Sequence, residues 1–402
     1  MKVLFISTTN PNNKLASWLY IRGIAEAFFE IAKTKFWFSD FDCEGEPTSV
    51  QDFKCVKVFE RKKSRVILSR IKSLFGNIYS RGAYEKKRVL SLRKTIIEFQ
   101  PNIVVYTSLS ASSYFFDVKK IKPETTSVLI QHNVEYLVAD GLSKFGRNAL
   151  QRAYYLVQKR SVKKFERKMM ELSDYVISIS DSDRNYFRKT YCINADKIFT
   201  IRPLIEYKVN LYGRENKNNN KTISFVSSFD WYPNIRGAEF FIKSVLPTLV
   251  ERFPTLKLYL VGRDPVRSIY RLKDEFPGNI VVTGSVENIY DYYKISDCIV
   301  IPVFLGPGIK LKVLEAMASG VPTVMTSYVA KDYDLLDKGF CIADTPDEFV
   351  EHISKILTDS EFANELSKRQ VQWYENYLIS EKEHAEEVIK TILFSHSKNE
   401  NN

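Results

Sequence analysis

Cysteine and histidine are both scarce in this sequence of 402 residues, which contains five of the first and four of the second. The cysteines are scattered, no two form a Cys-x-x-Cys pair, and none lies beside a histidine at a metal-binding spacing. This pattern argues against a disulfide framework or a zinc site and favours reduced thiols. We therefore expect no metal and no other cofactor.

The chain also lacks a long uninterrupted apolar run. No stretch approaches the roughly 18–20 residues that a membrane-spanning helix needs. At the N-terminus, one lysine precedes the short apolar run from Val3 to Ile6, which is too short for a secretory signal peptide. We therefore expect a cytoplasmic protein that is either soluble or peripherally bound to the inner face of the plasma membrane.

Acidic residues are scarce in the first half of the chain. Residues 1–205 hold 36 Lys and Arg against 20 Asp and Glu, a net charge of +16, whereas the remaining residues hold 23 against 28, a net charge of −5. Together these give the formal net charge of +11 for the whole chain. The asymmetry predicts that the N-terminal half faces an anionic partner.

The basic residues gather around one amphipathic pattern at residues 64–80. Apolar side chains from Ile67 to Ile78 recur at helical spacing, and lysines and arginines continue as far as Lys94. A helix of this kind can lie on anionic lipid, so residues 61–94 are a candidate for binding an anionic membrane surface. The alternative is an ordinary helix that packs its apolar stripe on a sheet. No aromatic-basic RNA motif accompanies these bases, and we expect no nucleic-acid partner.

Short apolar strands alternate with helical patterns along most of the chain. Such alternation predicts βαβ units and parallel, doubly wound sheets, which is the α/β class. The length exceeds what one hydrophobic core usually supports, so two domains are expected. A polar stretch without apolar periodicity, Glu215 to Lys221, interrupts the alternation and is typical of a linker. The expected organisation is a Rossmann-like domain at 1–205, a linker at 206–221, a second Rossmann-like domain at 222–370, a helix at 371–394 and a disordered tail at 395–402.

The stretch from Ile301 to Thr323 carries the clearest chemical signal. It reads as an apolar strand, a Gly-Pro-Gly loop, Lys-x-Lys and a helix that contains Glu315. A glycine turn that leads into a helix presents free N–H groups and the positive end of the helix dipole to an anion. Lys310 and Lys312 add positive charge suited to a phosphate or diphosphate. The alternative is a capped helix in which Glu315 only offsets the dipole.

The run Glu-Ala-Met-Ala-Ser-Gly-Val-Pro at residues 315–322 resembles the donor-site signature of the family 4 retaining glycosyltransferases. That signature places another glutamate eight positions upstream, where this chain has Pro307, but the loop at 306–312 resembles the Gly-Ala-Gly-x-Lys-x-Lys version found in members that also lack it. The resemblance implies the glycosyltransferase B architecture, in which two Rossmann-like domains face a central cleft. It further implies that the first domain binds the acceptor and the second the nucleotide-sugar. A C-terminal helix would cross back onto the first domain, with Trp373 and Tyr374 as candidates to anchor it.

Two further strand ends resemble donor-binding segments of the same family, and a third strand end, Val261-Gly262-Arg263, is a candidate from its position alone. The segment 225–234 is similar to a Gly-Ser-Met/Phe-Asp-x-x-Pro-Asn motif, and Arg236 follows it as a candidate to grip the diphosphate. Residues 282–286 resemble the turn whose backbone reads the nucleobase. Ligands in open α/β sheets bind at the carboxyl ends of strands, although each segment could equally be a plain strand-to-helix turn. The predicted donor-binding residues are Ser228, Asp230, Asn234, Arg236, Gly262, Gly284, Val286, Gly308, Ile309, Lys310, Leu311, Lys312 and Glu315.

In the first half of the chain, His132 follows a predicted buried strand. The sequence His-Asn-Val-Glu at 132–135 resembles a family segment in which the histidine lies near the donor sugar. A neutral imidazole there can hydrogen-bond a sugar hydroxyl, and Asn133 and Glu135 are expected on the acceptor side. The resemblance thus implies three catalytic residues, which are His132, Lys310 and Glu315. The other histidines, His352, His384 and His396, lie in C-terminal sequence and are expected to face solvent.

The resemblance implies a retaining hexosyltransferase that moves a sugar from a UDP- or GDP-sugar to a glycan or lipid-linked acceptor, in surface polysaccharide or glycoconjugate synthesis. In a mechanism proposed for this fold, the leaving diphosphate itself accepts the acceptor's proton, and the enzyme stabilises the diphosphate charge. Two other classes of function remain open at this point. One is an epimerase of the same fold that acts on a UDP-sugar without an acceptor, and the other is a non-catalytic scaffold that binds glycan or membrane.

Overall fold

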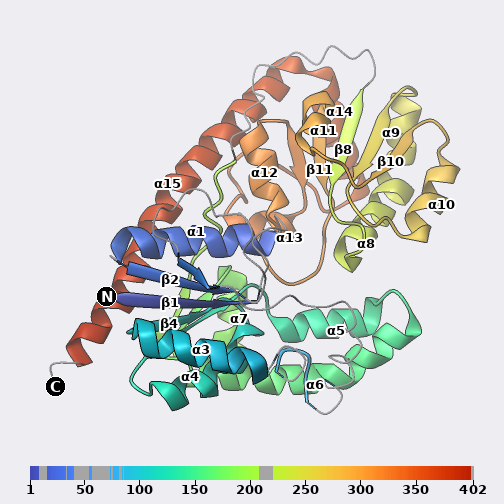
Figure 1. Cartoon of the computed structure of the whole chain (residues 1–402). Coiled ribbons are helices and arrows are strands. Elements are labelled where there is room, and N and C mark those ends of the chain that lie inside the picture. The colour runs from blue at the N-terminus through green and yellow to red at the C-terminus, as the bar shows by residue number, and fades with distance from the viewer. Residues whose placement is uncertain are drawn as a thin grey trace. The chain divides into compact units, whose positions relative to one another are not determined.

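The computed structural model describes residues 1–8, 16–32, 34–39, 54–56, 73, 76–80, 84, 86–207 and 221–399 (Figure 1). The chain divides into two compact units. Unit 1 comprises Met1–Ile205 together with Ser380–Asn402, and unit 2 comprises Glu206–Ile379. Each unit is built on its own parallel sheet, which confirms the predicted α/β class with two Rossmann-like domains.

Unit 1 contains a seven-stranded sheet with the order β3-β2-β1-β4-β5-β6-β7, and its neighbouring strands pair in parallel. The central strands are continuous apolar runs because helices bury both faces of a parallel sheet. The chain first builds outward from β1 and then returns to add β4 on the other side, so the strand order reverses between β1 and β4. The strands are β1 Lys2–Ser7, β2 Thr34–Ser39, β3 Lys54–Val56, β4 Ile103–Tyr106, β5 Thr126–Gln131, β6 Tyr175–Ser178 and β7 Ile198–Thr200.

Helices cover both faces of this sheet. On one face, Leu4 and Ile6 belong to a buried cluster that includes residues of α3, α4, α6 and α7. On the other face, the ring of Phe5 packs edge-on against Phe28 of α1, with the ring centroids 5.6 Å apart. The helices of unit 1 are α1 Ala16–Ile31, α3 Lys86–Phe99, α4 Phe115–Ile121, α5 Glu135–Phe145, α6 Ala149–Leu172 and α7 Asp181–Tyr191, with 3-10 turns at Ala111–Tyr114 and Ala195–Lys197.

Unit 2 contains a six-stranded parallel sheet with the order β10-β9-β8-β11-β12-β13. Numbered from β8, this is the doubly wound order 3-2-1-4-5-6, and the strand order reverses between β8 and β11. Five of the strands were predicted, whereas the two-residue β13 is too short to produce a sequence pattern. The strands are β8 Thr222–Val226, β9 Lys257–Val261, β10 Ile280–Gly284, β11 Cys298–Ile301, β12 Thr323–Met325 and β13 Cys341–Ile342.

The helices of unit 2 begin and end at residues that the sequence marks clearly. Gly320 ends α12 in the left-handed conformation with φ 71°, and the side chains of Thr345 and Glu348 form a capping box at the start of α14. A short π-helix, Phe241–Val245, separates α8 from α9. The helices are α8 Tyr232–Phe240, α9 Leu246–Arg252, α10 Arg267–Glu275, α11 Tyr290–Ile295, α12 Lys312–Ser319, α13 Ser327–Ala330 and α14 Pro346–Thr358, with a 3-10 turn at Lys331–Tyr333.

The last helix, α15 Ser360–Asn399, contributes to both units, because its residues from Ser380 onward belong to unit 1. It is longer than the predicted helix at 371–394 and continues into the segment expected to be a disordered tail. Trp373 stacks on Tyr377 with 5.1 Å between the ring centroids, and the Tyr374 hydroxyl accepts a hydrogen bond of 2.6 Å from the Tyr207 backbone. Trp373 also packs edge-on against Tyr333, with 6.1 Å between the ring centroids, so contacts within unit 2 hold the first half of α15 on the unit from which the helix starts.

Different residues hold the second half of α15 in unit 1. Arg202 binds Glu381 at 3.0 Å, and the His384 imidazole lies 3.0 Å from the carbonyl oxygen of Thr200. His352 likewise lies 3.1 Å from the carbonyl oxygen of Ile342. The expectation that these histidines face solvent was wrong for His352, which is half-buried, whereas His384 is exposed although its imidazole meets a carbonyl group.

Some predictions concern residues that the structure does not describe. Residues 208–220 of the predicted linker lie outside the described residues, as do residues 61–72, 74–75, 81–83 and 85 of the candidate membrane surface. Within the described part of the chain, no helix combines the length and apolar character needed to cross a membrane.

Candidate functional site

The strand order of unit 2 brings two loops to the same edge of its sheet. β8 and β11 are neighbours at the position where the strand order reverses, and a helix follows each of them. In open α/β sheets, ligands bind beyond the carboxyl ends of the strands at this position. The loops at 227–231 and 302–311 therefore form the candidate site, and their side chains meet there.

Lys312, the first residue of α12, links these two loops. Its Nζ donates hydrogen bonds to Oγ of Ser227 at 2.5 Å and to Oδ1 of Asn234 at 2.8 Å, and it lies 5.0 Å from the centroid of the Phe225 ring. The amide of Asn234 also donates to the carbonyl oxygen of Ser228 at 2.8 Å. The ammonium group is therefore fixed beside the first turn of a helix, where free N–H groups and the helix dipole favour an anion.

The surroundings of Lys312 disfavour the charged form of its side chain. Burial, and secondly the like charge of Lys310, lower the pKa of Lys312 to about 7, although Glu315 opposes this shift. A buried ammonium group of this kind gains strongly from an anion that compensates its charge. The chemistry of the position thus suits a phosphate or diphosphate group.

Glycine at two positions allows the loops around Lys312 to approach one another. Gly262 has φ +145°, and a Cβ atom on it would lie 1.7 Å from the carbonyl oxygen of Ser227. Gly306 has φ +104°, and a Cβ atom there would lie 2.5 Å from Cγ of Pro233. L-residues rarely adopt these dihedral angles, and no side chain fits in this space. Both glycines therefore set the shape of the candidate site.

Lys310 organises the loop that precedes α12. Its Nζ donates to the carbonyl oxygens of Gly306 at 2.8 Å, of Pro307 at 3.2 Å and of Gly308. The side chain is 8% exposed, and the hydroxyl of Tyr328 binds the Gly306 carbonyl from another side at 2.7 Å. Because three carbonyl groups point at one ammonium group, Lys310 holds the Gly-Pro-Gly turn closed.

Glu315 lies about one turn after Lys312 on α12, close enough to Tyr290 and Tyr293 to interact with them electrostatically. Burial raises its pKa to about 7, and the charge of Lys312 opposes the shift. Burial and then the negative charge of Glu315 raise the pKa of Tyr290 to about 12, and the same two causes raise the pKa of Tyr293. A carboxylate in such surroundings is a strong acceptor for hydroxyl groups, because little water competes with them.

The other predicted donor residues of unit 2 lie in three places. Ser228 donates to Asp230 at 2.5 Å and accepts from Nε of Arg263 at 3.1 Å, so it shapes the loop after β8. Arg236 is exposed on α8. Gly308 and Ile309 are buried in the turn that Lys310 holds, whereas Leu311 is half-buried immediately before α12.

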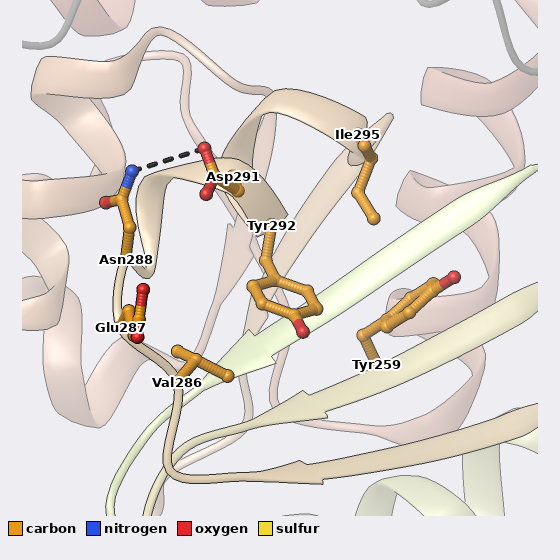
Figure 2. Close-up of a pocket in the computed structure, with 7 residues that line it drawn as sticks. All are labelled: Tyr259, Val286, Glu287, Asn288, Asp291, Tyr292 and Ile295. Atoms are coloured by element: carbon orange, nitrogen blue, oxygen red, sulfur yellow. Dashed lines mark hydrogen bonds between the residues drawn. The ribbon is translucent and has the colours of Figure 1, made fainter.

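Gly284 and Val286 lie at the end of β10, beside a groove of about 560 Å³ along α11. Figure 2 shows the rings of Tyr259 and Tyr292 next to each other in this groove, with Val286 below Tyr292. The two ring centroids are 5.8 Å apart. Val286 thus faces a groove that Tyr259 and Tyr292 also line, and Gly284, with φ +69°, allows the turn after β10.

In unit 1, the predicted residue His132 lies immediately after β5. Its Nε2 is 2.5 Å from the carbonyl oxygen of Thr107, and its ring packs edge-on against Tyr20 at 5.3 Å. A carbonyl oxygen only accepts, so Nε2 carries the proton and Nδ1 is left as an acceptor. Burial lowers the pKa of His132 to about 4, although the Thr107 contact opposes this. The imidazole is therefore neutral near neutral pH.

A buried pair of carboxylates fixes the segment that follows His132. Glu166 of α6 accepts hydrogen bonds from the backbone N–H of Glu135 at 2.7 Å and of Tyr136 at 3.3 Å, which cap the start of α5. It also accepts from the hydroxyl of Tyr191 at 2.6 Å. The side chain of Glu135 accepts from the hydroxyl of Tyr79. Sequence reasoning missed Glu166, because nothing in its local pattern distinguishes it from the exposed charges of α6.

The buried pair predicts a specific dependence of stability on pH. Burial raises the pKa of Glu166 to about 8 and that of Glu135 to about 7, well above their values in an unfolded chain. The folded state therefore keeps protons that the unfolded state releases, so this contribution is complete below about pH 4.5 and is lost as the pH rises through 7 to 8. We expect Glu166→Gln, which cannot ionise, to flatten the fall in the free energy of unfolding between pH 5.5 and 8.

Urea denaturation at several pH values measures this slope. Glu171→Gln is the matched control, because Glu171 lies on the same helix but is partly exposed and paired with Arg167. The control should keep the wild-type slope. An unchanged slope in Glu166→Gln would show that Glu166 does not hold a proton in the folded state.

Ser227 is a second residue that the sequence did not identify. It is adjacent to the predicted Ser228, but it is the side chain of Ser227 that binds Lys312. Neighbouring residues of a strand point to opposite faces of the sheet. The sequence does not indicate which of the two serines after β8 has its side chain on the same side as Lys312. Among the described residues, no cluster of three or more His, Cys, Asp or Glu side chains is placed to hold a metal ion.

Comparison with known proteins agrees with this geometry. Residues 220–359 match the family profile of glycosyl transferases group 1, and residues 53–208 match that of glycosyltransferase family 4. Together with the two parallel-sheet units, these matches define an enzyme, a glycosyltransferase of the B architecture. The chain belongs to the group 1, family 4 glycosyltransferases.

Solved structures share this fold along nearly the whole chain, at low sequence identity. A glycosyltransferase from Rickettsia africae is 14% identical with a TM-score of 0.65, and 98% of each chain is covered. Sucrose-phosphate synthase from Thermosynechococcus elongatus is 15% identical with a TM-score of 0.67, covering 98% of this chain and 99% of its own. The HepE protein of Anabaena, in complex with UDP and glucose, is 13% identical with a TM-score of 0.65, covering 97% and 99%. No curated protein sequence matches the chain significantly.

Proposed function

We propose that this glycosyltransferase transfers a hexose with retention from a UDP- or GDP-sugar to a glycan or lipid-linked acceptor, in the synthesis of a surface polysaccharide or glycoconjugate. The observation that carries the proposal is the ammonium group of Lys312, which Ser227 and Asn234 hold at the start of α12. A diphosphate would accept hydrogen bonds from this group and from the helix N–H groups. The Anabaena protein, whose structures contain UDP or UDP-glucose, supports a nucleotide-sugar as the donor.

In this proposal, Lys312, Glu315 and Lys310 of unit 2 have different roles in binding and activating the donor. Lys312 and the N–H groups of α12 stabilise the negative charge that grows on the leaving diphosphate, an interaction strongest in the transition state. Glu315 accepts hydrogen bonds from the ribose hydroxyls. Lys310 keeps the Gly-Pro-Gly turn in the shape that the diphosphate requires, since its ammonium group already binds three carbonyl oxygens of that turn.

The proposed roles in unit 1 concern the sugar and the acceptor. Nδ1 of the neutral His132 accepts a hydrogen bond from a hydroxyl of the donor sugar. Asn133 and Glu135 lie on the acceptor side, and Glu166 positions them by capping α5. No protein carboxylate is assigned as a nucleophile. The acceptor hydroxyl gives its proton to an oxygen of the leaving diphosphate as the new glycosidic bond forms.

The location of the reaction follows from the acceptor class. A lipid-linked acceptor would bring the enzyme to the cytoplasmic face of the plasma membrane as a peripheral protein. The net charge of +16 at residues 1–205 supports contact with an anionic surface, and residues 61–94 remain a candidate for that contact.

A thermal-shift series tests the proposed donor. We expect UDP or GDP, and the matching nucleotide-sugar, to raise the melting temperature, because a ligand that binds only the folded state stabilises it. Incubation of the donor with candidate acceptors, followed by analysis of the anomeric linkage, then tests retention. Isomerised donor formed without an acceptor would instead identify an epimerase. The absence of any nucleotide binding would favour a non-catalytic scaffold and overturn the proposal.

A further inference from the structure

The helical hairpin formed by α5 and α6 in unit 1 carries an unusual combination of side chains at its turn. Four large apolar side chains between residues 145 and 157 are exposed: Phe145 at 37%, Leu150 at 84%, Leu156 at 59% and Val157 at 65%. Isolated apolar residues are common on protein surfaces. Phe145 ends α5, and the other three lie in the first half of α6, where Leu150 and Val157 are seven residues apart and so share one face of the helix. We name residues 145–157 the hairpin tip, and exposed apolar side chains gathered in this way mark an interaction surface.

The charge around the hairpin tip has a single sign. Residues 141–165 contain seven Lys and Arg and no Asp or Glu. Lys144 and Lys159 both bind Asp140, at 2.6 Å and 2.8 Å, so these two bases are partly neutralised. Arg160 and Lys164 are exposed on the outer side of α6. The apolar tip is therefore bordered by positive charge that faces solvent.

Hydrogen bonds define the turn between α5 and α6. Asn148 caps α6 by accepting a hydrogen bond of 2.8 Å from the backbone N–H of Gln151, and the side chain of Gln151 in turn binds the backbone of Arg147 at 2.7 Å. Gly146 lets the two helices turn sharply, since a Cβ atom on it would lie 2.6 Å from the carbonyl oxygen of Leu142. Figure 1 shows α5 and α6 running side by side, with their connecting turn at the end of the hairpin. The exposed side chains are thus presented on an ordered surface.

We propose that the hairpin tip docks on an anionic lipid surface, with Leu150, Leu156 and Val157 in the interfacial layer and the basic residues of α6 against the headgroups. Apolar side chains bordered by lysine and arginine are typical of interfacial membrane contacts, and each base near an anionic surface strengthens binding. A nucleic acid would match the charge but would leave the exposed leucines and valine without an apolar partner, whereas the interfacial layer of an anionic membrane takes up both the apolar and the basic side chains. The proposal is independent of the transfer reaction and lies outside residues 61–94.

Co-sedimentation of the full chain with vesicles tests the proposal. We expect binding to vesicles of equimolar phosphatidylcholine and phosphatidylglycerol, and little binding to phosphatidylcholine alone. Leu150→Ser with Val157→Ser, and separately Arg160→Glu with Lys164→Glu, should each lower the partition coefficient at least about tenfold. These side chains are exposed, so the fold should persist. Ile379→Ser, which changes another exposed apolar residue of a different unit, is the matched control and should bind like the wild type.

The vesicle-binding results distinguish a lipid surface from an acidic protein or a nucleic acid as the partner. Undiminished vesicle binding in both double variants, or no vesicle binding by the wild type, would overturn it. Loss of binding in the charge variant alone would also overturn it, because a purely electrostatic surface suits an acidic protein or a nucleic acid. The thermal shift caused by UDP or GDP should be the same in all variants, so a failure of the donor assignment is detected separately.

Discussion

Lys312→Met is expected to lower kcat/KM for the nucleotide-sugar about a thousandfold, the effect of removing a group that stabilises charge in the transition state. Methionine keeps much of the length of lysine and removes the ammonium group that Ser227 and Asn234 hold beside α12. The melting temperature should not fall and is expected to rise slightly, because burial of that ammonium group is costly in the folded protein. Steady-state kinetics and a thermal melt measure the two effects.

A second lysine of unit 2 provides the comparison. Lys294→Met changes a half-exposed side chain on α11 that pairs with Asp291 within the same helix, at 3.6 Å. This control should keep wild-type kinetics. If Lys312→Met turned over donor at the wild-type rate, Lys312 would be excluded from charge stabilisation, and the same result in Glu315→Ala would exclude the ribose contact.

Gly262→Ala is expected to destabilise unit 2 by about 3 to 5 kcal/mol, the range for backbone strain combined with a steric clash. The new Cβ atom would lie 1.7 Å from the carbonyl oxygen of Ser227, and backbone atoms cannot move aside as a flexible side chain can. The φ angle of +145° adds strain for any L-residue. The melting temperature should fall by about 10 °C, and nucleotide binding should weaken because the loop that carries Ser227 is displaced.

Gly278→Ala separates the effect of backbone strain from the effect of the steric clash. Gly278 also has a positive φ, +93°, but a Cβ atom there would have no neighbour within 4 Å. This variant should show only the cost of strain, about 1 to 2 kcal/mol, and should bind nucleotide normally. Equal losses of stability in the two variants would contradict the close approach of the loops after β8 and β9.

The fold could be predicted from the sequence because its determinants are local. Continuous apolar strands such as Val3 to Ile6 and the helical patterns between them establish parallel sheets. The proposed donor loop is also defined by local sequence. Its glycines, its two lysines and Glu315 lie within ten residues of one another, so their spacing alone describes a helix start that suits an anion.

Contacts between residues far apart in the chain could not be predicted from the sequence. The partners of Lys312 lie 85 and 78 residues away, at Ser227 and Asn234. The difference between Lys310, which binds its own loop, and Lys312, which faces the loop after β8, depends on side-chain direction. Glu166 caps α5 from a helix that begins after it, and a glutamate among the many charges of α6 gives no local sign of burial.

A crystal structure of the full chain with UDP tests the central claim most directly. The account predicts that the diphosphate lies within hydrogen-bond distance of Nζ of Lys312 and of the backbone N–H groups at the start of α12, with the ribose hydroxyls on Glu315. A nucleotide bound elsewhere in unit 2, with Lys312 still bonded only to Ser227 and Asn234, would contradict it.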